Sequence, residues 1–332
     1  MPNPETQSKT VLVTGATGFI GGHLLPVLSQ EGGKIVAAVR SEDGQPFEAS
    51  VRWVVVGEID GQTDWQAALE GVDTVVHLAA RAHQIKDTSA DPEGDFQRVN
   101  VQGTANLVRQ CVEHGVKHFV FISSIGAMAT LSATQLTAES PCHPDTPYGR
   151  SKLDAEKAVI ELAGDAMTWT ILRPTLVYGA GNPGNMERLI KLVDKGLPLP
   201  FGAIDNRRSF VYVGNLVDII LRVMTHPKAA NQVFLASDGE DLSTPDLICA
   251  LAACADKPCQ LLKISPGILR LGGILGDVLQ SALGRPVGLN SETMARLLGS
   301  LFVDNGKLRS HLDWRPPYSL STGLQRTLNL KS

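Results

Sequence analysis

Residues 14–21 read Thr14-Gly15-Ala16-Thr17-Gly18-Phe19-Ile20-Gly21 and come directly after an apolar run, Thr10–Val13, that has the composition of a buried β-strand. A glycine-rich turn between a strand and a helix is the arrangement that binds the diphosphate of a dinucleotide, because the N-terminus of a helix attracts phosphate. Gly15 permits the tight turn, Gly18 lets the backbone approach the diphosphate, and Gly21 allows close packing of the helix. The stretch therefore predicts a dinucleotide-binding unit at the start of the chain.

Short β-branched runs alternate with helical stretches through the first half of the sequence. Near-continuous apolar strands between amphipathic helices predict a parallel sheet that is covered on both faces, which is the doubly wound Rossmann arrangement of the α/β class. The first helix is expected to run to about Gln30. The predicted strands are Thr10–Val13, Lys34–Val39, Val51–Val56, Thr74–Leu78, Lys117–Ser123 and Thr168–Leu172.

The alternation breaks after Arg173-Pro174, where Gly179–Gly202 is rich in Gly and Pro and predicts a change of domain. Arg208–Val213 and Val233–Leu235 have the composition of further strands, and Ser243-Thr244-Pro245-Asp246 carries the start signals of a helix. We therefore expect a dinucleotide-binding domain over residues 8–178, rejoined by about 206–238, and a smaller, discontinuous C-terminal substrate-binding domain over 179–205 and 239–330.

The composition favours a globular protein with small-molecule partners. The 332 residues include 43% hydrophobic and 19% charged residues, and the formal net charge of −4 gives no basic excess for binding nucleic acid. Met1–Lys9 is polar and lacks the apolar region of a secretory signal, which predicts a cytoplasmic location. The five cysteines form no CxxC pair, and Cys249, Cys254 and Cys259 recur every five residues on different helix faces, so we expect neither a disulfide framework nor a metal site.

Gly267–Leu283 is apolar, but Arg270, Asp277 and several glycines interrupt it. The stretch is too short to span a bilayer comfortably, and a helix that is buried or packed on the surface is the expected structure. Peripheral contact with a membrane is the alternative, although the polar face lacks the basic residues that such helices carry. We expect no stable membrane insertion.

Tyr148 and Lys152 stand four residues apart in Tyr148-Gly149-Arg150-Ser151-Lys152, and this spacing puts both side chains on one face of a helix. A cation beside a phenol favours the phenolate and lowers a pKa that is ordinarily near 10. Tyr148 is therefore a candidate to exchange a proton with a substrate oxygen near neutral pH. The same spacing also occurs on ordinary solvated helices.

The glycine spacing, the Tyr148/Lys152 pair and Ser124 at the end of a strand together resemble the short-chain dehydrogenase/reductase superfamily. The similarity is to its extended branch, the NAD-dependent epimerase/dehydratase family, which modifies nucleotide sugars, and it covers nearly the whole chain. Further matching motifs are Gly57-Glu58-Ile59, His77-Leu78-Ala79-Ala80, Asn100-Val101-x-Gly103-Thr104, Phe121-Ile122-Ser123-Ser124, Leu172-Arg173-Pro174 and Arg208-Ser209-Phe210-Val211-Tyr212-Val213.

The resemblance implies three catalytic residues. Tyr148 would be the general acid/base, Lys152 would hold the nicotinamide ribose and lower the tyrosine pKa, and Ser124 would bind the reacting oxygen of the substrate. Ser123 is the rival of Ser124, since adjacent strand residues point to opposite faces, and the family alignment favours Ser124. The implied cofactor contacts are Gly15, Thr17, Gly18, Phe19, Ile20, Gly21, Arg40, Glu58, Ile59, Ala79, Ala80, Tyr148 and Lys152.

The end of the second strand bears on the choice of cofactor. NAD enzymes usually place an acidic residue there for the ribose 2′-hydroxyl, whereas Arg40 suits the 2′-phosphate of NADP. NADP is therefore the expected cofactor, with NAD as the alternative, because Glu42 and Asp43 lie nearby. Glu58 replaces the Asp that contacts adenine in the family.

The resemblance also implies contacts with a nucleotide-sugar substrate. Arg208 stands where the epimerases carry an arginine that binds phosphate, with the adjacent Arg207 as its rival, and Phe201-Gly202 matches a segment that lines the uridine. Asn185 is either a phosphate ligand or the N-cap of a helix over Met186–Lys195. The full set of expected substrate contacts is Ser124, Tyr148, Asn185, Phe201 and Arg208.

The reaction is narrowed by what is absent. Ile125-Gly126 follows Ser124 where the dehydratases carry Asp-Glu, and Cys142 and His143 are no convincing match for the acid/base pair of the 3,5-epimerases. A 4-keto reductase and a 4-epimerase remain. Arg40 favours NADPH-dependent 4-keto reduction of a UDP-4-keto-6-deoxy-N-acetylhexosamine for surface polysaccharide synthesis.

Three alternatives stay open. The first is a UDP-hexose 4-epimerase, acting on UDP-glucose or UDP-GlcNAc, that retains NAD. The second is a reductase of an apolar ketone, favoured if Gly267–Leu283 lines an apolar pocket, and the third is a non-catalytic NADP sensor with this fold. By resemblance we also expect a homodimer that forms through the helices near Phe96–His114 and Tyr148–Leu162.

Overall fold

The main sheet has seven parallel strands in the order β3-β2-β1-β4-β5-β6-β9. The structure is a computed structural model that describes residues 9–42, 50–82, 89, 91–182, 185–283 and 290–329. All six strands predicted in the first half are confirmed, and Val233–Leu235 is part of the seventh. The strands are β1 (Thr10–Thr14), β2 (Lys34–Val39), β3 (Val51–Val55), β4 (Thr74–His77), β5 (His118–Ile122), β6 (Thr168–Pro174) and β9 (Gln232–Ala236).

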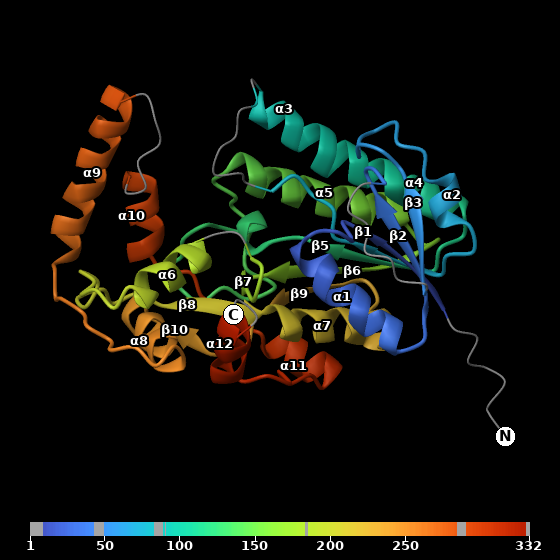
Figure 1. Cartoon of the computed structure of the whole chain (residues 1–332). Helices are drawn as coiled ribbons and strands as arrows, with labels where there is room; N and C mark the ends of the chain where they lie inside the picture. Colours follow the sequence, from blue (N-terminus) through green and yellow to red (C-terminus); the bar gives the residue numbers. More distant parts are fainter. Residues whose placement is uncertain are drawn as a thin grey trace.

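Helices cover both faces of this sheet, as Figure 1 shows. One face carries α1 (Phe19–Gln30), α7 (Val213–Thr225) and α11 (Gly306–Leu312), and the other carries α2 (Gln66–Leu69), α4 (Thr104–Glu113) and α5 (Pro147–Ala163). Alternate residues of each strand serve opposite faces, so that Val11 and Val13 pack under α1 whereas Leu12 packs in the other layer. The predicted doubly wound Rossmann fold is therefore confirmed.

A second, three-stranded sheet lies beside the carboxyl ends of the main strands, in the order β10-β8-β7. Its strands are β7 (Leu176–Tyr178), β8 (Arg208–Tyr212) and β10 (Asp241–Leu242), and the helices around it are α6 (Asn185–Asp194), α8 (Thr244–Cys254), α9 (Pro266–Leu283), α10 (Ser291–Leu298) and α12 (Leu320–Asn329). Ser243 caps α8 in a capping box with Asp246, as its sequence signal predicts. Short connecting helices are α3 (Pro92–Phe96), the π-helix η1 (Gln97–Gly103), and the 3₁₀ turns η2 (Ile125–Ala127) and η3 (Pro227–Ala229).

Cys249 and Cys259 form a disulfide, with their Cα atoms 5.2 Å apart, so the expectation of no disulfide is wrong. That expectation placed three cysteines on one continuous helix. Instead α8 ends at Cys254, and the chain reverses near Asp256, whose φ is +53°, which brings Cys259 back beside Cys249. The described residues contain no group of His, Cys, Asp and Glu side chains that could hold a metal ion.

Candidate active site

The glycine-rich turn lies between β1 and α1, at the carboxyl edge of the main sheet. Gly15 has φ +66°, and a Cβ atom there would lie 2.7 Å from the backbone nitrogen of Ala79. Gly18 is the N-cap of α1, and no described side chain caps that helix end, so its first N–H groups face outward. The strand order changes direction between β1 and β4, which is where a dinucleotide binds in such sheets. The geometry of this turn fits a dinucleotide, and the other predicted contacts Thr17, Phe19, Ile20 and Gly21 lie in the same turn and the start of α1.

The expected adenosine end of the dinucleotide site holds an ion pair. The Nη1 atom of Arg40, just after β2, lies 3.6 Å from the Oε1 atom of Glu58, which follows β3, and both side chains are exposed. Ile59 is buried, and Ala79 and Ala80 follow β4 across from the glycine turn. Asp43, the alternative partner for NAD, lies outside the described residues.

Tyr148 is in the first turn of α5, where Thr146 and Pro147 start the helix. The Thr146 hydroxyl accepts a hydrogen bond from the backbone nitrogen of Gly149 at 3.0 Å. The Tyr148 hydroxyl has a side-chain hydrogen bond with Ser124, which lowers its pKa, but loss of water around the hydroxyl has the larger effect and raises it. The expectation of a lowered tyrosine pKa is therefore wrong for this structure.

The ammonium group of Lys152 explains that difference. Its Nζ atom donates to the backbone oxygen of Ile122 at 2.8 Å and lies 4.2 Å from the centre of the Phe121 ring. Burial lowers the pKa of Lys152 to about 7, while the nearby Glu156 acts in the opposite direction. The end of β5 thus binds the cation that was expected to act on the phenol of Tyr148.

A buried charged cluster lies behind Lys152, and the sequence reasoning did not assign it. The Nε and Nη2 atoms of Arg173 donate to Glu156 at 3.0 and 2.6 Å, and the Ser123 hydroxyl also donates to Glu156. Ser123 therefore points into the protein, whereas Ser124 lines a cavity with Tyr148. The four-residue spacing of Lys152 and Glu156 in the sequence could have indicated that the two side chains lie close together on one helix face.

Asn100 joins the turn after β4 to the helix that carries Tyr148. It lies in the π-helix η1, and its side chain donates to the Ser151 hydroxyl at 2.9 Å and to the backbone oxygen of Arg81 at 3.1 Å. Its amide oxygen accepts from the Arg81 backbone nitrogen at 2.8 Å. The motif that contains Asn100 was noted in the sequence, but no role was predicted for it. The buried Asn100 amide connects the segment after β4 to helix α5.

One cavity of about 680 Å³ brings together residues that are far apart in the sequence. Ser124, after β5, and Tyr148, in α5, line it on the side of the main sheet, and Phe201, Arg208 and Arg296 line it on the side of the second sheet. Arg208 also donates to the backbone oxygen of Gly299 at 3.2 Å, and burial lowers its pKa. The cavity thus combines a hydroxyl pair, the three arginines Arg188, Arg208 and Arg296, and a largely apolar lining.

The remaining substrate candidates differ in position. Arg207 turns away and pairs with Asp241 at 2.8 Å, so it is not the guanidinium in the cavity. Asn185 is the first residue of α6, and its side chain lies outside the described part of the structure. The next residue, Met186, lines the cavity.

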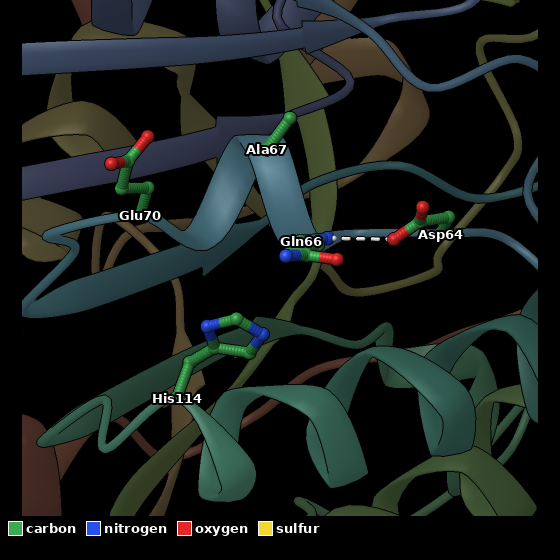
Figure 2. A pocket seen from close by; sticks show the side chains of 5 residues that line it. All are labelled: Asp64, Gln66, Ala67, Glu70 and His114. Carbon is green, nitrogen blue, oxygen red and sulfur yellow. Dashed lines mark hydrogen bonds between the residues drawn. The ribbon is translucent and has the colours of Figure 1, made fainter.

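A second hollow of about 440 Å³ lies between α2 and the end of α4 (Figure 2). Asp64, Gln66, Ala67, Glu70 and His114 line it, and Asp64 accepts a hydrogen bond from the backbone nitrogen of Gln66 at 2.9 Å. These residues are exposed or cap the short helix α2, and none of them lines the cavity that holds Tyr148.

A Rossmann sheet with this glycine turn, and a Tyr148/Ser124 pair at a cavity of the same protein, has the elements of a nicotinamide-dependent oxidoreductase. The sequence matches the model of the NAD dependent epimerase/dehydratase family over residues 11–236. The chain belongs to that family and is an enzyme of the extended short-chain dehydrogenase/reductase type.

Similar proteins extend over nearly the whole chain. It is 41% identical to a "UDP-glucose 4-epimerase" of Vibrio cholerae over 328 residues, which cover 96% of this chain and 94% of that protein. It is 30% identical, with the same coverage, to "N-acetyl-alpha-D-glucosaminyl-diphospho-ditrans,octacis-undecaprenol 4-epimerase" of Escherichia coli O157:H7. The structure of "MoeE5 in complex with UDP-glucuronic acid and NAD" is 26% identical, has a TM-score of 0.74 and covers 97% of this chain and 98% of its own.

Proposed function

We propose that this protein is a UDP-hexose 4-epimerase that retains NAD. The observation that carries the proposal is the single cavity that joins the Ser124–Tyr148 hydroxyl pair to the guanidinium of Arg208. The hydroxyl pair suits proton exchange at a sugar oxygen, and the guanidinium suits a diphosphate. The 41% identity to the Vibrio cholerae protein named UDP-glucose 4-epimerase supports the same reaction.

In this proposal Tyr148 takes the proton of the C4 hydroxyl and later returns a proton to the same oxygen. Ser124 donates a hydrogen bond to that oxygen as its negative charge develops. NAD, held by residues 15–21, Arg40, Glu58, Ile59, Ala79, Ala80 and Lys152, supplies the acceptance and return of the C4 hydride. In this proposal Lys152 binds the nicotinamide ribose, and its Nζ atom also donates to the backbone oxygen of Ile122.

The diphosphate and the base lie toward the second sheet in this proposal. Arg208 and Arg296 both line the cavity, and their charges suit the two phosphates. The ring of Phe201 supplies an apolar surface against which a base packs. In this proposal the dinucleotide contacts all lie within residues 8–178, whereas the substrate contacts beyond Ser124 and Tyr148 are Phe201 in 179–205, Arg208 in 206–238 and Arg296 in 239–330.

Reduction of a UDP-4-keto-6-deoxy-N-acetylhexosamine by NADPH is the second candidate, and Arg40 is the observation that favours it. However, the Glu58 carboxylate lies 3.6 Å from the Arg40 guanidinium and adds negative charge where a 2′-phosphate would bind. Repulsion between the two anions favours NAD over NADP. The reductase of apolar ketones lacks its required feature, because none of the described residues of α9 lines the cavity.

The sugar diphosphate of the substrate is attached either to a nucleoside or to another carrier. The Escherichia coli relative is named for a sugar diphosphate carried on undecaprenol, a long-chain lipid alcohol. Aliphatic side chains line much of the cavity in this chain, among them Leu176, Leu189, Leu247 and Leu297. A polyprenyl diphosphate sugar is therefore a second candidate substrate for the same C4 chemistry.

The test is to identify the nicotinamide released from the denatured purified protein, and then to follow turnover. We expect NAD, and interconversion of UDP-glucose with UDP-galactose or of UDP-GlcNAc with UDP-GalNAc without net change in cofactor. Stoichiometric consumption of NADPH with a UDP-4-keto-6-deoxy-GlcNAc would instead establish the reductase. Tyr148→Phe should abolish turnover and leave cofactor binding unchanged, whereas unchanged turnover would contradict the role of Tyr148.

We also propose a homodimer that forms through Phe96–His114 and Tyr148–Leu162. These segments form η1, α4 and α5, which pack together on one face of the main sheet. Ile160 on the outer side of α5 is exposed, as a contact for a second copy would be. Sedimentation velocity of Ile160→Arg should then give a monomer, and a dimer in both proteins would contradict this surface.

A further inference from the structure

The helix α9 lies at the outer edge of the molecule (Figure 1). One of its faces is apolar and exposed. Six large aliphatic side chains on it are each between 50% and 63% exposed, and these are Ile268, Leu271, Ile274, Leu275, Val278 and Leu279. At 3.6 residues per turn they share one side of the helix. Exposed apolar surface gathered in this way marks a contact surface.

The opposite side of α9 attaches the helix to the protein. Leu269, Gly273, Gly276 and Gln280 are the more buried positions toward α10, and a Cβ atom at Gly273 would lie 2.9 Å from the Cγ atom of Met294. Asp277 accepts a hydrogen bond from the backbone nitrogen of Ser291 at 3.2 Å. The packing of α9 is therefore made by Leu269 together with small and polar residues, while the six exposed aliphatic side chains lie on the other side.

The composition of this face favours lipid over another protein chain. The face is purely aliphatic. Interfaces between proteins are instead enriched in aromatic residues and arginine, and hydrogen bonds cross them. The charged residues of α9 are Arg270 and Asp277, and both lie outside the aliphatic stripe. One helix face is also smaller than the roughly 800 Å² per partner of a stable protein interface. In the described residues no helix is long and apolar enough to cross a membrane, so α9 would lie along a bilayer surface.

The helix beneath α9 connects this face to the proposed active site. Met294 of α10 contacts α9, and Glu292, Thr293, Met294, Arg296 and Leu297 of the same helix line the cavity with Tyr148 and Ser124. A surface that holds α9 would therefore lie one helix away from the cavity.

We propose that the aliphatic face of α9 docks the protein on a lipid bilayer, so that the cavity receives the sugar diphosphate of a membrane-resident polyprenyl diphosphate sugar. The substrate part of this proposal rests on the proposed C4 epimerase function, whereas the docking part does not. Because the contact is aliphatic and has few basic residues, burial of apolar surface drives it. Binding should therefore need no anionic lipid and should persist at high salt.

The test is flotation of the full-length protein with vesicles, without substrate or turnover, so that it is independent of the enzymatic activity. The vesicles are phosphatidylcholine alone, or an equal mixture with phosphatidylglycerol, each at low and high salt. The wild-type protein should float in all four conditions. Leu271→Gln with Leu275→Gln and Val278→Gln should lower the bound fraction about tenfold or more, since three exposed aliphatic contacts are lost.

The control variant carries Arg270→Gln, which removes a charge on α9 itself, and Val55→Gln, which removes an exposed apolar side chain far from α9. It should float like the wild type, and all three proteins should share one thermal unfolding midpoint. Wild-type protein that stays at the bottom, a triple variant that floats equally well, or loss of binding at high salt would each overturn the docking surface. A wild-type dimer that the triple variant converts to a monomer without lipid would overturn it in favour of a second copy.

Discussion

Arg173 holds the carboxylate of Glu156 through hydrogen bonds of 3.0 and 2.6 Å in a fully enclosed layer behind Lys152. The pair joins β6 to α5. Glu156 also accepts a hydrogen bond from the hydroxyl of Ser123, which follows β5. Burial lowers the pKa of the neighbouring Lys152 to about 7, and Glu156 opposes this shift and so favours the ammonium form. One carboxylate thus links the position of α5 to the charge of Lys152 on the same helix.

Glu156→Gln should therefore lower the free energy of unfolding by about 3 kcal/mol or more, because it leaves the Arg173 cation buried without its partner. Urea unfolding at pH 7 measures the loss. Asp154→Asn on the same helix is the control, since it breaks only the exposed Lys157 pair and should cost under about 1 kcal/mol. Equal and small losses in the two variants would contradict a structural role for the buried pair.

Stability should fall as the solution is acidified below pH 6.5. Burial lowers the pKa of His77 to about 3 and that of His118 to about 4. Between these values and 6.5 the unfolded chain binds protons that the folded protein does not, so each histidine contributes a slope of up to about 1.4 kcal/mol per pH unit. The stability that they contribute is present above pH 6.5 and is lost as pH falls toward 3.

Replacing His77 isolates its part of that slope. His77→Gln should reduce the dependence of unfolding free energy on pH in this window by up to about 1.4 kcal/mol per pH unit, measured by urea unfolding at several pH values. His114→Gln changes an exposed histidine in the hollow of Figure 2 and should keep the wild-type slope. A wild-type slope in His77→Gln would show that the buried ring does not resist protonation.

Cofactor preference should respond to Glu58. Glu58→Gln removes the negative charge beside Arg40, so the affinity for NADP relative to NAD should rise about tenfold, which corresponds to about 1.4 kcal/mol. Calorimetric titration with each dinucleotide measures the ratio. Glu70→Gln, an exposed carboxylate in the second hollow, should leave the ratio unchanged. An unchanged ratio in Glu58→Gln would remove the electrostatic argument for NAD.

Substitutions of the adjacent arginines Arg207 and Arg208 should differ in their effect on substrate binding. Arg208→Lys keeps the charge but loses the planar fork that binds phosphate, so KM for a UDP-hexose should rise about tenfold. Arg207→Lys alters the pair with Asp241, which lies outside the cavity, and should change KM little. Steady-state kinetics of the two variants measure the difference, and equal effects would contradict the assignment of Arg208 to the diphosphate.

The local parts of this structure follow from the sequence, and the missed parts depend on contacts between distant segments. The parallel strands were predictable because β-branched runs recur between helices. In contrast, β7 and β10 are three and two residues long and form by pairing with β8, which no short sequence window indicates.

In the candidate active site, too, the local features were predictable from the sequence and the contacts between distant segments were not. The Tyr148/Lys152 spacing predicted one helix face, yet the ammonium binds the carbonyl of Ile122, a partner that only the position of β5 supplies. The disulfide of Cys249 with Cys259 depends on a chain reversal after α8. The apolar composition of Gly267–Leu283 was visible in the sequence, whereas the outward direction of its large side chains depends on the packing of α10.

The most direct test of the account is the fate of the hydride at C4. The purified protein is incubated with UDP-glucose that carries deuterium at C4, and the epimeric product is analysed by mass spectrometry and NMR. An epimerase that retains NAD and moves only the proton through Tyr148 should return the deuterium to C4 of the product. Loss of deuterium from C4, or turnover only when NADPH is supplied and consumed, would contradict the proposed function.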